Sequence, residues 1–195
     1  MKTVSYRIEG TSPLLMHNDR LANPFDDFTK AIKAISGKRK KTEDDLHEMA
    51  RLEFLGGVYE SQATGIHVPG FNVFAMLKNA AKLRKLGASV NRAVIVEEDE
   101  IALEFPDKGK TAAELYKNRA YVDMRTIKNG PTSGRVVRCR PIFREWALSF
   151  TLAFDERAIQ RSDLDMVLED AGAMVGLGDY RPRFGRFEVA AGAKQ

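Results

Sequence analysis

The residues best suited to chemistry form one stretch near the C-terminus, residues 176–187, called here the glycine loop. Glycines, arginines and aromatic residues are interspersed there, between a helix-like and a strand-like pattern. Glycine lets a backbone approach an anion, guanidinium groups bind phosphate through paired hydrogen bonds, and aromatic rings stack on bases. The alternative is a basic hairpin that only closes a sheet. The candidate phosphate-binding residues are Gly176, Gly178, Tyr180, Arg181, Arg183, Phe184, Gly185 and Arg186.

Positive and negative side chains are segregated along the sequence. The chain contains 31 Lys and Arg against 27 Asp and Glu, a formal net charge of +4. Residues 61–96 hold five bases and no acid, five acids crowd residues 97–104, and residues 119–149 hold seven bases against two acids. This segregation predicts a surface that binds a polyanion, with the acids elsewhere, although solvated faces produce similar runs. The cations expected on that surface include Lys78, Lys82, Arg138 and Arg140.

His17 is the candidate for acid–base catalysis. It follows the first predicted strand, and a general acid or base needs reach and a suitable pKa. The alternative is that His17 only stacks on, or hydrogen-bonds to, the end of that strand. His67 alternates with apolar neighbours and is expected on a sheet surface, whereas His47 lies in a charged helix and is expected to be solvated.

The sequence predicts neither a metal nor a cofactor. Asp26 and Asp27, like Asp163 and Asp165, lie at predicted helix starts, where carboxylates complement the backbone dipole. The sequence contains no Walker loop, nucleophile elbow or dinucleotide fingerprint. An ordinary metabolic enzyme is therefore not expected.

Composition favours a globular protein in a reducing compartment. The 195 residues are 44% hydrophobic and 30% charged, enough to bury a core. The single cysteine, Cys139, permits no internal disulfide, which indicates a cytoplasmic protein. No apolar run approaches the roughly 18 residues of a membrane span, and the N-terminus enters a strand pattern directly, so no membrane association is expected.

The strands that would position these residues show a period of two. Residues 3–10 and 146–154 alternate between apolar and polar side chains, which is typical of half-buried strands. Residues 135–143 alternate as well, which predicts a cationic face with Arg138 and Arg140 and an apolar face with Val137, Cys139 and Phe143. Further predicted strands are a hairpin over residues 56–68 and short strands at residues 93–96, 101–105, 121–124 and 186–190.

Two predicted helices cover the sheet. One starts at Pro69-Gly70 and runs to Leu86, with Gly87 as its stop. The other starts after a Ser162 cap, carries Met174 on its apolar stripe and ends at Gly176.

Two further segments interrupt this core. Residues 23–55 predict an inserted pair of helices, the second opened by a capping box of Thr42 and Asp45. The loop between the two helices carries four candidate nucleic-acid contacts, Lys38, Arg39, Lys40 and Lys41. Residues 125–134 are rich in turn formers and predict a loop. The simplified plan is βαββαβ with insertions, an α+β protein with an antiparallel sheet that has helices on one face and the other face available for binding.

Three stretches together resemble the RAMP superfamily, the ferredoxin-like proteins that build CRISPR effector complexes and process their RNA. The glycine loop resembles that superfamily's glycine-rich loop, because it contains Gly-Leu-Gly at residues 176–178 and, after six further residues, Gly-Arg-Phe at residues 185–187. Residues 66–74 are similar to the strand, Pro-Gly and helix element of its repeating backbone subunits. Residues 10–17, Gly-Thr-Ser-Pro-Leu-Leu-Met-His, stand where those subunits end their first strand with a turn.

The resemblance implies a single RAMP-like domain over residues 1–195, with a ferredoxin-like or RRM-like core. It implies binding of guide RNA or single-stranded DNA along the glycine loop and at Asn72, where the Pro-Gly helix starts. A thumb-like loop at residues 119–135 would add Arg125 and Lys128. The implied partners are single-stranded RNA or DNA, copies of the chain arranged head to tail, and other CRISPR effector subunits.

The resulting expectation is a non-catalytic, oligomeric subunit that coats single-stranded nucleic acid. Target-cleaving members of the superfamily place an aspartate before an Asn-Pro-like pair, and this chain has Ala22 before Asn23-Pro24, so cleavage by that route is not expected. The alternatives are a metal-independent RNA endonuclease that uses His17 and a protein-binding mimic or inhibitor of a CRISPR assembly.

Overall fold

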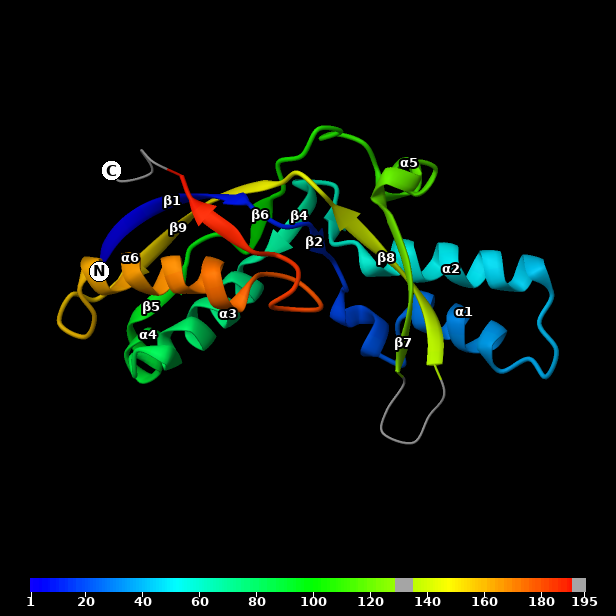
Figure 1. The fold of residues 1–195 in the computed structure, drawn as a ribbon, viewed down its shortest axis with the longest axis horizontal. Helices are drawn as coiled ribbons and strands as arrows, with labels where there is room; N and C mark the ends of the chain where they lie inside the picture. The colour runs from blue at the N-terminus through cyan, green and yellow to red at the C-terminus, as the bar shows by residue number, and fades with distance from the viewer. Residues whose placement is uncertain (129–134, 191–195) are drawn as a thin grey trace. The chain divides into compact units, whose positions relative to one another are not determined.

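The computed structural model describes residues 1–128 and 135–190, and the chain forms two compact units. Unit 1 contains residues 1–15, 61–109 and 143–195, and unit 2 contains residues 16–60 and 110–142. The protein is α+β with antiparallel sheets (Figure 1). The predicted helical insertion, residues 23–55, and the described parts of the predicted thumb-like loop, residues 119–128 and 135, fall within unit 2.

Unit 1 is built on a four-stranded antiparallel sheet in the order β10-β1-β9-β5 (Figure 1). Val4, Tyr6 and Ile8 alternate with exposed neighbours along β1 and are at most 2% exposed, as the sequence predicted. On β9 the alternating residues from Leu148 to Phe154 are buried as well. The bounds of the strands are β1 (Lys2–Gly10), β5 (Val94–Val96), β9 (Ala147–Phe154) and β10 (Phe187–Val189).

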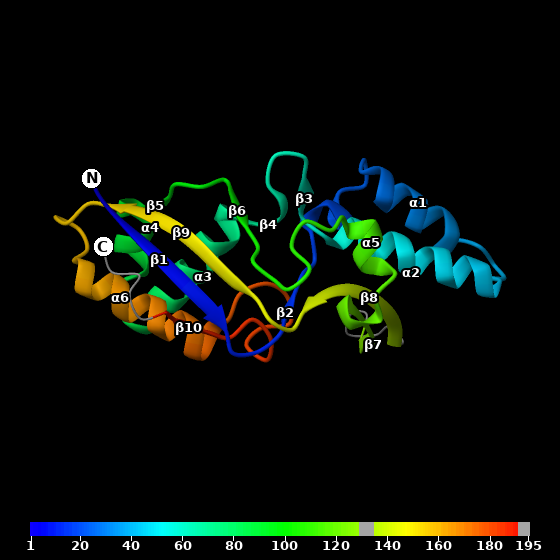
Figure 2. The ribbon, with the colours of Figure 1, turned by 90° about the horizontal axis from the view of Figure 1, so that it is seen from above.

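The helices of unit 1 pack on the apolar face of this sheet (Figures 1 and 2). Tyr6 Oη donates to Asp165 Oδ1 at 2.7 Å, and Arg161 both pairs with Asp165 at 3.1 Å and lies 5.5 Å from the Tyr6 ring. These contacts fasten α6 to the centre of β1. The helices are α3 (Gly70–Leu83), α4 (Gly87–Ala93), α6 (Arg161–Asp170) and a π-helical turn η3 (Ala171–Val175).

Two helix ends differ from the prediction. Helix α3 ends at Leu83, and Gly87, the predicted stop, begins α4 instead. Lys85, at φ 61°, takes the left-handed conformation in which glycine was expected. Helix α6 is capped by Gln160 rather than Ser162.

Met174 does not belong to the apolar stripe of this helix, since it is 50% exposed. The reason is that Ala171–Val175 forms a π-helical turn, which shifts the faces of the last residues. Gly176 ends the helix at φ 77°, as predicted.

A smaller sheet completes unit 1. Strands β4 (Gly65–Pro69) and β6 (Glu100–Ala102) pair antiparallel, and β3 (Glu60–Ser61) lies beside β4. The strand predicted at residues 101–105 is therefore shorter than expected. The two-residue strands β2 (Leu14–Leu15) and β3 lie where the chain passes from one unit to the other.

Unit 2 combines the predicted helical pair with a two-stranded hairpin. Helix α2 begins with the predicted capping box, in which Thr42 and Asp45 bond each other's backbone. The same arrangement of Thr111 and Glu114 opens α5. The elements are η1 (Asp19–Ala22), α1 (Asp27–Ser36), α2 (Glu43–Gly57), α5 (Ala112–Tyr116), η2 (Arg119–Tyr121), β7 (Val122–Lys128) and β8 (Arg135–Phe143), the last of which ends at the boundary with unit 1.

The loop predicted over residues 125–134 is wrong in its first part. Strand β7 continues to Lys128 because residues 122–128 pair residue by residue with residues 135–141 of β8. Residues 129–134, the remainder of the predicted thumb-like loop, lie outside the described residues, as do the side chains of residues 127 and 128.

In the described parts of the chain, no helix combines the length and the apolar character needed to cross a membrane.

Candidate nucleic-acid interface

The three glycines of the glycine loop allow the loop to pack against its own chain. Gly176, Gly178 and Gly185 have φ of 77°, 78° and 72°. A Cβ on Gly185 would lie 1.8 Å from the carbonyl oxygen of Leu177, and a Cβ on Gly178 would lie 2.4 Å from that of Leu15. The glycines are therefore required by close backbone contact inside unit 1, whatever the loop binds.

Most backbone amides of the glycine loop donate to groups of the chain itself. Leu177 N donates to Gly185 O at 2.9 Å, Asp179 N to Leu15 O at 2.8 Å and Gly185 N to Pro13 O at 2.8 Å. Arg186 N donates to Ser12 Oγ at 2.9 Å. These amides do not form the anion-binding cradle that the sequence suggested, so a phosphate on this loop would be bound by side chains.

The arginine side chains of the loop are available for that contact. Arg181, Arg183 and Arg186 are all exposed. Arg186 Nε donates to the carbonyl oxygen of Pro182 at 2.9 Å, which orients its guanidinium group. The loop thus presents three cations on a backbone that is held by hydrogen bonds at both ends.

One of the two aromatic residues expected to stack on bases is at the surface. Tyr180 is 49% exposed, whereas Phe184 is 8% exposed and packs edge-to-face with the Tyr180 ring at a centroid distance of 6.0 Å. The buried Phe184 ring therefore packs against the Tyr180 ring, and Tyr180 is the exposed aromatic residue of the loop that a base can contact.

The sheet face opposite the helices of unit 1 is acidic. Arg7 Nη1 donates to both carboxylate oxygens of Glu104 at 2.7 and 2.8 Å, so its charge is compensated. Glu9 and Glu188 are paired across β1 and β10 and share this face. A nucleic-acid backbone would be repelled here, and the prediction that the open face of the sheet binds is not supported by its charges.

The candidate nucleic-acid-binding residues of helix α3 lie at opposite ends of the helix. Asn72 lies in its first turn and Lys82 in its last, about 15 Å apart along the helix axis. Lys78 and Lys82 line an open groove of about 400 Å³ at the C-terminal end, together with Lys85, Gly87, Ala88 and Asn91. Lys82 Nζ donates to Asn79 Oδ1 at 3.0 Å.

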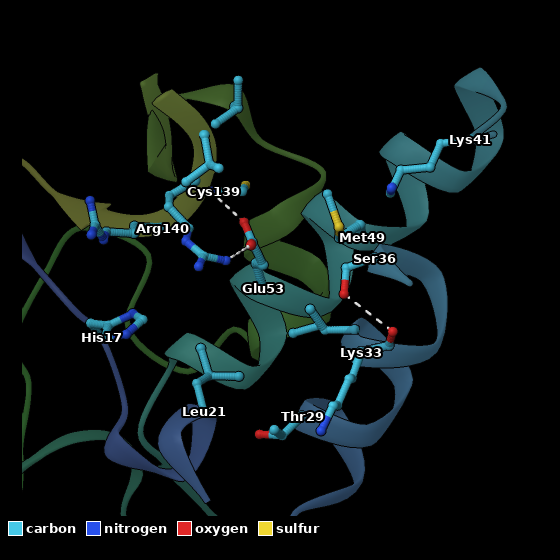
Figure 3. Close-up of a pocket in the computed structure, with 14 residues that line it drawn as sticks. His17, Leu21, Thr29, Lys33, Ser36, Lys41, Met49, Glu53, Cys139 and Arg140 are labelled. Carbon is cyan, nitrogen blue, oxygen red and sulfur yellow. Dashed lines mark hydrogen bonds and ion pairs between the residues drawn. The ribbon is translucent and has the colours of Figure 1, made fainter. Parts of the chain in front are cut away.

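Unit 2 brings four further candidates into one pocket. His17, Lys41, Arg138 and Arg140 line a cavity of about 640 Å³ formed by α1, α2 and β8 (Figure 3). The other residues that line it are Leu21, Thr29, Ile32, Lys33, Ser36, Met49, Glu53, Val136, Val137 and Cys139. His17 and Arg140, which are 123 positions apart in the sequence, thus line one pocket.

Glu53 organises the floor of this pocket. It is 5% exposed, accepts from Arg138 Nη1 and also accepts the backbone N–H of Cys139 at 2.9 Å. Two positions further along β8, Arg140 is 7% exposed. The predicted cationic face of β8 is thus a partly buried, ion-paired face turned toward α2, and Val137 on the supposed apolar face is 53% exposed.

The neighbouring strand adds a second ion pair to the same hairpin face. Asp123 lies opposite Arg140 and Arg125 opposite Arg138. Both nitrogens of the Arg125 fork bond the Asp123 carboxylate. Two arginines directly across a hairpin repel each other, and the carboxylates of Asp123 and Glu53 compensate that repulsion.

The cationic run before α2 is exposed, as expected. Lys38 Nζ bonds Asp45 Oδ1 at 2.6 Å, and Lys41 Nζ donates to the carbonyl oxygen of Lys38 at 3.1 Å. Arg39 and Lys40 have exposed side chains. Of the four, Lys41 lines the pocket.

The histidines differ in their surroundings. His17 is exposed at the pocket, and His47 is exposed on α2, as expected. His67 is buried, at 6% exposure, with Nδ1 3.0 Å from Gly65 O, so its prediction as a sheet-surface residue is wrong. Within residues 1–128 and 135–190, no three side chains of His, Cys, Asp or Glu are grouped to hold a metal ion.

Sequence reasoning missed Glu53 and Lys33, which line the pocket, and Asp123, which lies opposite Arg140 on the neighbouring strand. A signal for Glu53 existed, since it lies between Leu52 and Phe54 in the second predicted helix of the insertion, and an acid that is buried among apolar residues needs a partner. The partner itself, Arg138, is 85 residues away and could not be assigned.

No family model matches this sequence, and no curated protein matches it.

Proposed function

We propose that this protein binds single-stranded RNA or DNA without cleaving it. The observation that carries the proposal is the separation of charge in unit 1: three exposed arginines and Tyr180 project from a hydrogen-bonded loop, while the open sheet face is acidic. Guanidinium groups bind phosphates and an exposed tyrosine stacks on bases without sequence preference. Sequence-independent binding is therefore expected.

The core of unit 1 is proposed to be ferredoxin-like. Its elements follow in the order β1, α3, β5, β9, α6, β10, which is βαββαβ once the additional elements are set aside. Strands β1 and β5 are both antiparallel to β9, which lies between them, so they form a split βαβ unit. This order supports the proposed kinship with RAMP backbone subunits, because that superfamily is built on the same core.

The proposed assembly is a head-to-tail oligomer along the strand, in which other CRISPR effector subunits could take part. Size-exclusion chromatography of the protein with oligonucleotides from about 10 to about 40 nucleotides tests it, since one subunit covers a limited number of nucleotides. The mass of the complex should rise in steps with strand length. A constant mass of one chain per strand at all lengths would contradict the assembly.

Binding itself is tested with three arginine substitutions and a matched control. Arg181→Ala, Arg183→Ala and Arg186→Ala together should weaken the binding of a fluorescent single strand strongly at low salt. The control replaces three exposed arginines elsewhere, Arg92, Arg119 and Arg157, and removes the same charge. Equal losses in the two triple variants would show that net charge, and not the glycine loop, provides affinity.

A second candidate, a metal-independent RNA endonuclease, is favoured by one observation. His17 is exposed and lines the same pocket as Arg138 and Arg140, where a scissile phosphate could be held near a general acid or base. Incubating structured RNA with the protein in EDTA tests it. Products that disappear with His17→Ala would support the endonuclease over the non-catalytic binder.

A further inference from the structure

Phe25 exposes an aromatic ring that its own chain leaves in water. Among the large hydrophobic side chains that the structure describes, it is the most exposed, at 80%. It lies in the connection between η1 and α1, and Asp26 and Asp27 follow it directly, so a nucleic-acid strand is repelled at this position. Burial of an aromatic ring is favourable, and aromatic residues are enriched in the cores of protein interfaces. The exposed ring therefore predicts a protein partner that covers it.

Hydrogen bonds hold the turn that carries Phe25. The Phe25 N–H donates to Asn23 Oδ1 at 3.0 Å, and Asp26 N donates to Asn23 O at 3.2 Å. Arg20 Nε donates to Asp26 Oδ2 at 3.0 Å and joins the turn to η1. A backbone that is ordered before binding loses less conformational entropy when it binds. Phe25 is thus suited to act as an anchor residue in an interface.

The pocket of unit 2 offers the apolar surface that such an anchor needs. Leu21, Ile32, Met49 and Val137 line it (Figure 3). Its volume of about 640 Å³ is larger than one aromatic side chain, so a ring can enter together with part of its turn. Phe25 does not line this pocket, so the ring of the same chain does not fill it. Interface anchors are typically seated in pockets of this kind.

The floor of the pocket favours an apolar group over a charged one. Glu53 accepts from Arg138 Nη1 and from the backbone N–H of Cys139. Arg140 lies opposite Asp123 across the hairpin. Because each arginine of the floor has a carboxylate beside it, the floor itself does not call for an anion.

The rim of the pocket complements the charge beside Phe25. Lys33 and Lys41 are exposed and line the pocket, whereas the three acids at the start of α2 do not line it. Asp27, two residues after Phe25, has a side chain that is 99% exposed and lies 3.4 Å from Lys30. With the ring in the pocket of another copy, Asp27 would meet the lysines at the rim. Exposed ion pairs add little affinity, but they orient the two partners.

We propose that Phe25 of one copy inserts into this pocket of the next copy. The ring and the pocket are different surfaces of one chain, so the contact repeats from copy to copy in one direction. The inference rests on the proposed head-to-tail assembly and names the residues that join its subunits. The contact is small, so it should be weak between free copies and stronger between copies that a strand holds side by side.

Disulfide trapping tests the position of the ring. One chain carries Asp27→Cys and a second chain of different mass carries Lys41→Cys, both with Cys139→Ala. A disulfide forms only where the two Cα atoms come within about 7 Å, so the mixed dimer should accumulate on mild oxidation. Phe25→Ser in the first chain should abolish it. The control is Leu46→Ser, which removes an exposed apolar residue of α2 that does not line the pocket and should leave the yield unchanged.

A mixing experiment tests the direction of the contact. Phe25→Ser removes the anchor, and Ser36→Trp fills the pocket from an exposed lining residue. In sedimentation equilibrium over a concentration series, each variant alone should associate at least about tenfold more weakly than the wild type. The two variants mixed should pair with wild-type affinity and stop at dimers, because one intact contact remains. The control for added bulk is Ala34→Trp, on the same helix and outside the pocket lining, which should associate as the wild type does.

Three results would overturn the proposal. The first is a mixed-disulfide yield that Phe25→Ser and Leu46→Ser change equally. The second is a wild-type protein that stays monomeric at every concentration and gives no mixed disulfide. The third is association that Ser36→Trp weakens and Phe25→Ser does not, since the pocket would then hold another segment.

Failure of this contact can be told apart from failure of the proposed function. The triple arginine variant of the glycine loop should still form the mixed disulfide, because the contact is built from residues of unit 2. If complexes grow with strand length while Phe25→Ser changes neither their mass nor the disulfide yield, the assembly stands and this contact is wrong. If the disulfide forms and depends on Phe25 while no strand binds, the contact stands and strand binding is wrong.

Discussion

At the scale of single residues, Gly185 is fixed by the backbone that faces it. Its φ is 72°, and a Cβ would lie 1.8 Å from Leu177 O, so a side chain requires the loop to move. Gly185→Ala should cost more than about 4 kcal/mol, as expected for a substitution that combines steric overlap with an unfavourable φ.

Gly65 supplies the control for this prediction. It has the same φ of 72°, but nothing lies within 4 Å of its Cβ position. Gly65→Ala should therefore cost only the backbone term, about 1 to 2 kcal/mol. Urea unfolding of the two variants measures the difference, and similar losses would show that the close approach to Leu177 is not decisive.

Cys139 gives a prediction about pH. Burial, followed by the nearby carboxylates of Glu53 and Asp123, raises the pKa of the Cys139 thiol from 9.0 to about 12. Because the folded state holds the proton more tightly, this contribution to stability is complete below pH 9 and is lost as the pH rises from 9 toward 12.

The Cys139→Ala variant isolates that contribution. The wild-type stability should fall relative to the variant by up to about 1.4 kcal/mol for each pH unit above 9. Denaturant unfolding of both proteins between pH 7 and the alkaline limit measures the difference. A difference that stays constant with pH would mean that the thiol titrates normally in the folded protein.

At the scale of elements, Glu53 joins α2 to β8. Its carboxylate bonds Arg138 and the Cys139 amide while being 5% exposed. Removing one partner of a buried ion pair leaves an uncompensated charge, so Glu53→Gln should cost about 3 kcal/mol, at the lower end of the usual range because Arg138 is partly exposed.

The control for this element is Glu48→Gln on the same helix. Glu48 pairs with Arg51 at 2.7 Å, and both side chains are 44% exposed. Its loss should cost less than about 0.5 kcal/mol. If thermal or urea unfolding gives equal changes for the two variants, the hairpin does not depend on the buried pair.

The strands in which buried and exposed residues alternate were predicted correctly from the sequence. Strands β1 and β9 were read from a period of two because one face of each is buried and the other is not. The end of α3 was predicted too late in the sequence. The residue that adopts the left-handed conformation after the helix is Lys85, where a glycine is usual, so the sequence carried no glycine signal at that point. The extension of β7 to Lys128 was missed because it depends on pairing with β8, which the local sequence does not specify. The turn-forming residues nearby favoured a loop instead.

The candidate site was predicted in part, for physical reasons that differ between residues. The exposed arginines of the glycine loop were identified from their spacing alone. The burial of Phe184 and Arg140 was not predicted, because it depends on contacts with residues that are distant in the sequence. The glycines were explained by anion binding, whereas the structure gives them a role in packing the loop against Pro13 and Leu15.

At the scale of the whole molecule, the account depends on a separation between acidic and basic surfaces. The acids of the open sheet face and the arginines of the glycine loop both belong to unit 1, so the separation does not require any placement of unit 2. A polyanion should therefore bind through the loop with a steep dependence on salt.

The dependence of strand affinity on salt tests this most directly. Fluorescence anisotropy with a labelled single strand gives the slope of log K against log salt concentration for the wild type, for the triple variant of Arg181, Arg183 and Arg186, and for the control at Arg92, Arg119 and Arg157. Each phosphate contact contributes about 0.7 to that slope, so the loop variant should lose about 2 and the control almost nothing. A wild-type protein that fails to bind at low salt, or equal slopes in all three proteins, would contradict the account.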